Sequence, residues 1–206
     1  GTDHDDAKRH GTLTVSEVLE KSSNVGTAKL ALQMQPQQMW NLLTSAGFGQ
    51  APRLGFPGTA AGRLRPAGSW KPIEQATISY GHGMSTSLMQ MAQSYLIFAR
   101  DGDMIPVTLL KAESDALSRP VISKDTAHAV RAMMELATGP KGTAPRAQVP
   151  GYRVAGKTRT AHKPVNGRYT NKYVSAFVGF APVSDPRIIV AVMVDEPSNG
   201  VHYGGD

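Results

Sequence analysis

The chain has 206 residues, of which 40% are hydrophobic and 18% are charged, a composition that indicates a globular protein and excludes a disordered one. Its net charge of +6 comes from scattered lysines and arginines without interleaved aromatic residues, which argues against nucleic-acid binding and for a basic surface facing an anionic membrane or cell wall. There is no cysteine, so neither a disulfide nor a thiolate metal site can form.

The sequence shows neither a membrane-spanning segment nor a signal peptide. No apolar run approaches the roughly 18 residues that a membrane-spanning helix needs, and the polar start at 1–6 does not resemble a signal peptide. Because the chain starts at Gly1 without a methionine, we expect a fragment or a processed piece of a longer protein.

Three helices are predicted in the first fifty residues. Thr14 and Glu17 have the spacing of a capping box, which predicts a helix start. The turn-forming run Ser22-Ser23-Asn24 ends that helix, because short polar side chains compete for backbone hydrogen bonds. Further helices are expected from Val25 and after Pro36.

The middle of the chain alternates loop and helix. Residues 49–72 are rich in Gly, Pro and Arg without any period, which predicts a long surface loop. Apolar residues at steps of three and four predict helices over 85–100 and 123–137. Residues 103–112 are expected to be extended.

The last part of the chain changes to the pattern of strands. Segments 152–161, 172–181 and 187–195 are rich in Val, Ile, Tyr and Phe and are separated by short turns, which favours an antiparallel meander. We therefore predict an α+β fold, with a mainly helical lobe over 1–150 and antiparallel strands over 151–206.

Two short motifs suggest acyl-transfer chemistry. Such a reaction needs an activated hydroxyl, a proton for the leaving amine and backbone N–H groups around an oxyanion. The Ser22-Ser23-Asn24 turn supplies a hydroxyl and an amide, and Lys157-Thr158-Arg159-Thr160 supplies a cation and two hydroxyls on a strand. Each motif alone is a weak signal, but their order and context together are far more specific.

The sequence resembles the division-specific class B penicillin-binding proteins of Gram-negative bacteria, the FtsI family (penicillin-binding protein 3), over essentially its whole length. Ser-x-Asn and Lys-Thr-Gly are two of the three motifs of penicillin-binding proteins and serine β-lactamases. The other matching segments are 3–15, 21–26, 78–84, 88–92, 166–173 and 201–205.

The resemblance implies a role for each matched residue. Ser22 is similar to the family's proton-relay serine, Asn24 to the amide that holds substrate and the general-base lysine, and Lys157 to the strand lysine that interacts with that serine. Thr158 and Thr160 resemble the hydroxyls that bind the substrate carboxylate, and the Thr160 N–H resembles half of the oxyanion hole.

The family also implies an activity and a location. Its members are D,D-transpeptidases that cross-link septal peptidoglycan through a serine acyl-enzyme, so the expected ligands are peptidoglycan stem peptides and β-lactam antibiotics. The expected partners are divisome membrane proteins, including the septal glycan polymerase. The expected place is the periplasmic face of the bacterial inner membrane, with an N-terminal anchor outside this chain and with no cofactor.

Other residues are weaker candidates. His82 lies where relatives often carry an aromatic residue near the cleft, and Tyr203 with its two glycines could border that cleft. His162 follows the strand motif but fits an exposed strand position better. The polar residues near the start suggest a solvated segment rather than a metal site: Asp3, His4, Asp5, Asp6 and His10.

The first departure from the family is Arg159, which stands where the family has glycine. Alternation along a strand places Arg159 on the same side as Lys157, where a second cation lowers the pKa of the lysine and crowds the cleft. Alternatively, Arg159 turns outward through a bulge or binds the substrate carboxylate. We expect impaired or altered acylation.

The second departure is that no Ser-x-x-Lys tetrapeptide occurs, so the chain contains no nucleophile. We expect a partial transpeptidase domain, inactive by itself and prone to associate through an unpaired sheet edge. Two alternatives remain open: a non-catalytic divisome interaction module disarmed by Arg159, and a serine β-lactamase relative, for which no deacylating Glu is evident.

Overall fold

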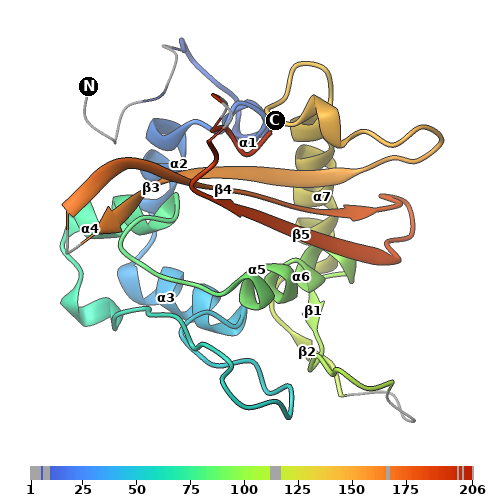
Figure 1. Ribbon diagram of the computed structural model, residues 1–206, viewed down its shortest axis with the longest axis horizontal. Coiled ribbons are helices and arrows are strands. Elements are labelled where there is room, and N and C mark those ends of the chain that lie inside the picture. The colour runs from blue at the N-terminus through green and yellow to red at the C-terminus, as the bar shows by residue number, and fades with distance from the viewer. Residues whose placement is uncertain are drawn as a thin grey trace.

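The computed structural model of the chain describes residues 6, 10–111, 117–165, 168–198, 200 and 202–205. Helices come first and a three-stranded antiparallel sheet comes last, so the α+β prediction is confirmed (Figure 1). The predicted site residues all lie within the described parts, whereas Asp3, His4 and Asp5 lie outside them.

The three N-terminal helices form where the sequence predicted them. They are α1 (Val15–Glu20), α2 (Asn24–Ala31) and α3 (Pro36–Ser45). The capping box is confirmed, because the Thr14 hydroxyl accepts from the Glu17 N–H at 3.3 Å and the Glu17 carboxylate accepts from the Thr14 N–H at 2.8 Å. The capping box therefore fixes the start of α1, and the turn at Ser22 separates α1 from α2.

The segment 49–72 is a loop as predicted, apart from the short 3-10 turn η1 (Ala67–Ser69). The fully buried side chain of Gln90 holds the loop in place by donating to the carbonyls of Gly47, Gln50 and Ala61. These carbonyls lie outside regular helices and strands. The buried Gln90 amide therefore supplies the hydrogen bonds that secondary structure would otherwise provide.

Helix α4 (Pro72–Ser79) was not predicted. It is short and carries few apolar residues, so its period is weak. Its buried Gln75 donates to the carbonyls of Ala31 and Met34, both 2.9 Å away and more than 40 residues distant in sequence. Tertiary contacts rather than local pattern therefore fix this helix.

The predicted helix over 85–100 is divided into α5 (Leu88–Ser94) and α6 (Leu96–Ala99). The break falls at Tyr95, whose N–H bonds to the carbonyl of Ala92 three residues earlier, a tighter turn than the α-helix has. Burial of the Tyr95 phenol between this break and the sheet raises its pKa.

The segment predicted to be extended over 103–112 forms a regular strand only at its start, and residue 112 lies outside the described residues. Regular pairing is limited to the two-residue strands β1 (Asp103–Met104) and β2 (Arg119–Pro120). The predicted helix over 123–137 is confirmed as α7 (Lys124–Thr138), and the 3-10 turn η2 (Pro145–Ala147) follows it.

The sheet has the order β3-β4-β5, with β3 (Ala155–Val165), β4 (Arg168–Ala181) and β5 (Ile188–Asp195). Both pairs are antiparallel, so the predicted meander is confirmed. The register of β3 on β4 is regular from Ala155 to His162, and it shifts only between His162 and Pro164.

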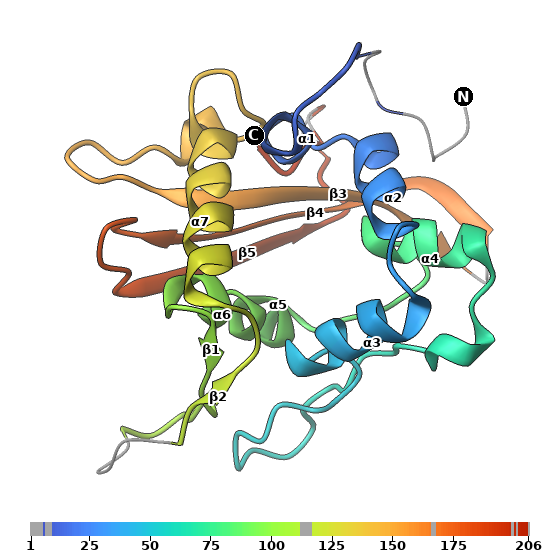
Figure 2. The same ribbon diagram turned by 180° about the vertical axis from the view of Figure 1, so that it is seen from behind.

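Helix α7 packs across one face of this sheet, as Figure 2 shows from behind. On that face Ala155, Val178 and Phe180 are almost completely buried, and they meet Tyr95 and Met134 from the helices. By strand alternation and register, Lys157 and Arg159 also belong to this covered face.

The opposite face of the sheet is turned toward the viewer in Figure 1. There Ile188, Val190, Val192 and Val194 of β5 are each about half exposed. Among the described residues, no helix is long and apolar in the way that a membrane-spanning segment must be.

Candidate active site

The Ser22 turn projects from the junction of α1 and α2. Ser22 has a φ of +58°, in the left-handed region, and its side chain is exposed. Ser23 is buried and caps α2, because its hydroxyl accepts from the Gly26 N–H at 2.9 Å. With Ser23 fixed inward, the strained backbone turns the Ser22 hydroxyl outward toward the sheet, and Asn24 begins α2, half-buried.

Asp6 supports this turn, although it had been assigned to a solvated segment. Its carboxylate accepts from the Ser23 hydroxyl at 2.6 Å and from the Val25 N–H at 3.1 Å. An acidic side chain at a helix N-terminus is favourable because it meets unpaired backbone N–H groups. No periodicity in the sequence could have signalled this contact.

Lys157 meets the turn from β3. Its Nζ donates to the Ser22 Oγ at 2.7 Å, a contact between residues 135 apart in the sequence, and to the carbonyl of Thr158 at 3.2 Å. The two motifs that the sequence analysis paired therefore lie in direct contact at one end of the sheet.

Burial lowers the pKa of Lys157 to about 8. The cause lies in its position on the covered face of the sheet, in line with Ala155 and opposite Val178, where the charged form loses hydration. The predicted direction of this pKa change is therefore observed, but burial causes it and not the neighbouring cation Arg159.

Arg159 stays on the same face as Lys157, so the outward bulge considered above is wrong. Its guanidinium extends away from the sheet and donates to the Gly81 carbonyl at 2.6 Å. Gly81 lies in the turn after α4, 78 residues earlier in sequence. Arg159 therefore bridges the sheet and the helical part of the molecule.

The two threonines face the other way. Thr158 shares a hydrogen bond of 2.8 Å with the Thr143 hydroxyl, and Thr160 accepts from the Gly204 N–H at 3.0 Å. Their hydroxyls thus lie on the opposite side of β3 from the Ser22–Lys157 pair, toward the 202–205 segment. Neither partner, Thr143 or Gly204, was predicted in the sequence analysis.

Tyr203 and His162 belong to one row of rings in contact, in which only Tyr173 and His202 are stacked. The centroids of His162 and Tyr173 are 4.5 Å apart, those of Tyr173 and His202 are 4.1 Å apart, and those of His202 and Tyr203 are 4.4 Å apart. Tyr203 is 60% exposed at the end of this row, whereas His162 is half-buried and not exposed as expected. The row attaches the 202–205 segment to β3 and β4.

His82 follows Gly81 directly and is half-buried, with its ring edge-on to Tyr80 at 5.5 Å. It therefore lies beside the turn that Arg159 contacts. Among the described residues, no group of three His, Asp or Glu side chains is arranged to hold a metal ion.

Comparison with protein families agrees with this geometry. Residues 1–206 match the penicillin-binding protein transpeptidase domain. The chain belongs to this transpeptidase family.

Relatives and solved structures support the assignment. The chain is 43% identical over 201 residues to a probable peptidoglycan D,D-transpeptidase PenA of Neisseria flavescens, covering 97% of this chain and 50% of that protein. It is 36% identical to the peptidoglycan D,D-transpeptidase FtsI of Escherichia coli K12, covering 97% of this chain and 34% of that protein. The chain therefore spans half or less of these curated relatives.

A solved transpeptidase domain of Burkholderia pseudomallei penicillin-binding protein 3 matches with a TM-score of 0.93 and 52% identity, covering 97% of this chain and 61% of that one. Penicillin-binding protein 3 of Mycobacterium tuberculosis complexed with aztreonam matches with a TM-score of 0.85 and 34% identity, covering 93% of this chain and 48% of that one. The chain therefore has the fold of the corresponding part of penicillin-binding protein 3.

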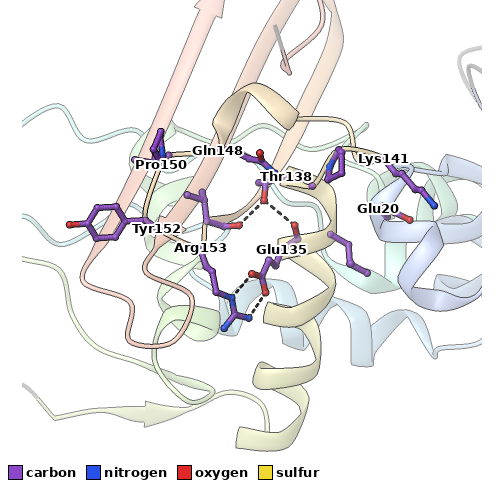
Figure 3. Close-up of a pocket in the computed structure, with 13 residues that line it drawn as sticks. Glu20, Glu135, Thr138, Lys141, Gln148, Pro150, Tyr152 and Arg153 are labelled. Atoms are coloured by element: carbon purple, nitrogen blue, oxygen red, sulfur yellow. Dashed lines mark hydrogen bonds and ion pairs between the residues drawn. The ribbon is translucent and has the colours of Figure 1, made fainter.

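A separate cavity of about 810 Å³ lies between the end of α7, the 139–154 loop and Glu20 of α1 (Figure 3). Its lining includes an ion pair with two hydrogen bonds, in which Arg153 donates to both carboxylate oxygens of Glu135 at 2.6 Å. None of the predicted site residues lines it. The transpeptidase motifs therefore lie outside this cavity.

Proposed function

We propose that the protein to which this chain belongs is a peptidoglycan D,D-transpeptidase that cross-links septal cell wall through a serine acyl-enzyme. The observation that carries this proposal is the 2.7 Å hydrogen bond from Lys157 to Ser22, which joins the two family motifs across 135 residues. The nucleophile is the serine of a Ser-x-x-Lys segment that these 206 residues do not include. The chain alone is therefore expected to be inactive.

Ser22 and Lys157 are assigned to proton transfer. The charged Lys157 ammonium donates to the Ser22 oxygen, which leaves the Ser22 hydroxyl hydrogen available to the nitrogen of the breaking C–N bond. When that hydrogen moves, the nearby positive charge stabilises the negative charge that develops on oxygen. The Asn24 amide, two residues later, is assigned to holding the substrate backbone and orienting the general-base lysine.

Substrate binding is assigned to β3 and its neighbours. Thr158 and Thr160 are expected to bind the terminal carboxylate of a stem peptide or of a β-lactam, with the Thr160 N–H facing the oxyanion. Arg159, on the other face of β3, is assigned to a separate contact with the same ligand. His82 and Tyr203 are assigned to the rims of the site. Complexes of a matching penicillin-binding protein 3 with aztreonam and with ampicillin support β-lactam binding.

A cellular setting follows from the same family. We expect the protein to act at the periplasmic face of the inner membrane, held by an anchor outside this chain. Its expected partners there are divisome membrane proteins, including the septal glycan polymerase. The similarity to FtsI of Escherichia coli supports the assignment to cell division.

Arg159 favours one alternative, a non-catalytic interaction module of the divisome. The arginine occupies the covered face beside Lys157, where the family's glycine leaves space for a ligand. A third possibility, a β-lactamase, requires deacylation to be fast. Acylation by penicillin distinguishes the transpeptidase from the non-catalytic module. The lifetime of the acyl-enzyme distinguishes the transpeptidase from a β-lactamase.

The deciding experiment is labelling of the full-length protein with fluorescent penicillin, with ampicillin as competitor. We expect a stable labelled band, and labelling about 100-fold slower in Ser22→Ala and Lys157→Ala because each removes a proton-transfer partner. Ser85→Ala and Lys172→Ala are the controls, since both positions are exposed and lie outside the site. Absence of label on the unsubstituted protein would reject the transpeptidase, and rapid loss of label would indicate a β-lactamase.

A further inference from the structure

Thr143 contacts one of the two threonines assigned to carboxylate binding, although the proposed function gives Thr143 itself no role. The Oγ atoms of Thr143 and Thr158 are 2.8 Å apart, and either hydroxyl can donate the hydrogen bond between them. Both residues are half-buried, so this bond is partly shielded from water. Its direction decides whether the hydroxyl hydrogen of Thr158 is available to a ligand.

The backbone fixes Thr143 between α7 and the end of the described chain. The Ala144 N–H donates to the Ala137 carbonyl of α7 at 2.9 Å, and the Ala144 side chain is almost completely buried. On the other side, a Cβ added to Gly205 would clash with the Thr143 carbonyl oxygen, so the two backbones are in contact. Figures 1 and 2 both show the 202–205 segment beside the loop after α7. Thr143 is therefore held firmly behind β3.

Thr160, two residues further along β3, shows which direction suits a ligand. Its Oγ accepts from the Gly204 N–H at 3.0 Å, and a backbone N–H can only donate. Among the described residues, the Thr160 hydroxyl has no acceptor for its own hydrogen, which therefore remains available to an anion. Thr158 lies on the same side of β3, and it has the same arrangement when Thr143 is the donor.

The chemistry of a carboxylate favours this direction. An ionised carboxylate is an acceptor only, so it can bind the two threonine side chains only through their hydroxyl hydrogens. When Thr158 donates to an anion, negative charge builds up on its oxygen, and a hydrogen bond from Thr143 stabilises that charge and strengthens the donated bond. A neutral ester gains less from this support, because hydrogen bonds between neutral groups are roughly half as strong.

We propose that Thr143 is a positioning residue for carboxylate recognition. It donates to the Thr158 Oγ and directs the Thr158 hydrogen toward the ligand carboxylate, in the way that the Gly204 N–H supports Thr160. The two threonines of β3 then form a pair of aligned donors, each supported from behind by a separate segment of the chain. This proposal rests on the proposed function, because the ligand is taken to be a stem peptide or a β-lactam.

The test uses the full-length protein and compares acylation by benzylpenicillin with acylation by its methyl ester. The measured quantity is the ratio of the two second-order rate constants, which does not depend on the fraction of protein that is active. We expect this ratio to be about fivefold lower in Thr143→Val and in Thr143→Ala, which remove the hydroxyl, and to be restored in Thr143→Ser, which keeps it. Thr59→Val is the control, because it removes a hydroxyl that bonds to the Phe56 carbonyl within the 49–72 loop, and it should keep the ratio.

A double substitution shows whether Thr143 acts through Thr158. In a Thr158→Val background, Thr143→Val should leave the ratio unchanged, because the hydroxyl that Thr143 orients is gone. An unchanged or higher ratio in Thr143→Val, no recovery in Thr143→Ser, or an equal loss in the Thr158→Val background would each overturn the positioning role.

Failure of this proposal is distinguishable from failure of the proposed function. If benzylpenicillin acylates the unsubstituted protein and Thr143→Val keeps the same ratio, only the role of Thr143 is rejected. If benzylpenicillin does not acylate the unsubstituted protein, the proposed function is rejected, and the role of Thr143 is rejected with it.

Discussion

At the scale of single residues, the site depends on two groups held in unfavourable states. Ser22 has a left-handed backbone conformation that costs a non-glycine residue on the order of 1 kcal/mol, and Lys157 keeps its ammonium on the covered face of a sheet. Residues in such states persist because the surroundings fix them, here the Ser23 cap with Asp6 on one side and the β3–β4 pairing on the other. Strain and burial of this kind gather at functional sites.

The lowered pKa of Lys157 predicts a basic limit to acylation. Below its pKa of about 8 the lysine is charged and donates to Ser22, and above it the amine is neutral and no longer stabilises negative charge. The rate constant for acylation by benzylpenicillin should therefore fall as the pH rises from 7 to 9. In Lys157→Arg, which stays charged throughout this range, the fall should disappear even if the maximal rate is lower. A fall of the same size in Lys157→Arg would assign it to another group.

The conformation of Ser22 predicts that glycine would make this position more stable, whereas serine is needed there for acylation. Glycine adopts a φ of +58° without steric cost, whereas alanine keeps that cost and, like glycine, lacks the hydroxyl. Ser22→Gly should therefore be more stable than Ser22→Ala by about 1 kcal/mol in chemical denaturation, while both variants lose acylation equally. Equal stability of the two variants would show that the turn relaxes when the side chain changes.

At the scale of elements, the sequence pattern predicted a helix or strand only where the element's own residues are enough to define it. Helix α7 was predicted because its buried residues recur at helical spacing and a glycine follows it, and the three strands were predicted from their β-branched residues and short turns. Helix α4 was missed because a buried amide, Gln75, fixes it through carbonyls of a distant segment.

The same distinction applies to the site. The pairing of Ser22 with Lys157 was expected from family motifs, since nothing in the local sequence of either segment points to the other. The partners of Arg159, Thr158 and Thr160 could not be predicted, because Gly81, Thr143 and Gly204 come from three separate segments that meet β3 only in the folded chain. A glycine that accepts a side chain against its backbone leaves no periodic signal.

At the scale of the whole molecule, helices cover one face of the sheet in the described part of the chain, whereas on the other face the 202–205 segment lies over β3 and β4 and leaves β5 exposed. Helix α7 and the break at Tyr95 bury one face, but the other presents a half-exposed row of Ile188, Val190, Val192 and Val194. Strand β5 pairs with β4 on one side, and among the described strands none pairs with its other side. An apolar strand with a free edge of this length is a template for pairing with another chain.

The exposed edge predicts that the isolated 206-residue chain associates as its concentration rises. Val192→Lys places a charge in the middle of the apolar row and should reduce association, because a buried, unpaired lysine opposes strand pairing. Sedimentation velocity from 1 to about 100 µM should show dimers or larger species for the unsubstituted chain and mainly monomer for Val192→Lys. Val25→Lys, on the exposed side of α2, is the matched control and should associate like the unsubstituted chain. A monomer at every concentration would mean that the β5 edge is protected, and equal association of Val192→Lys would place the contact on another surface.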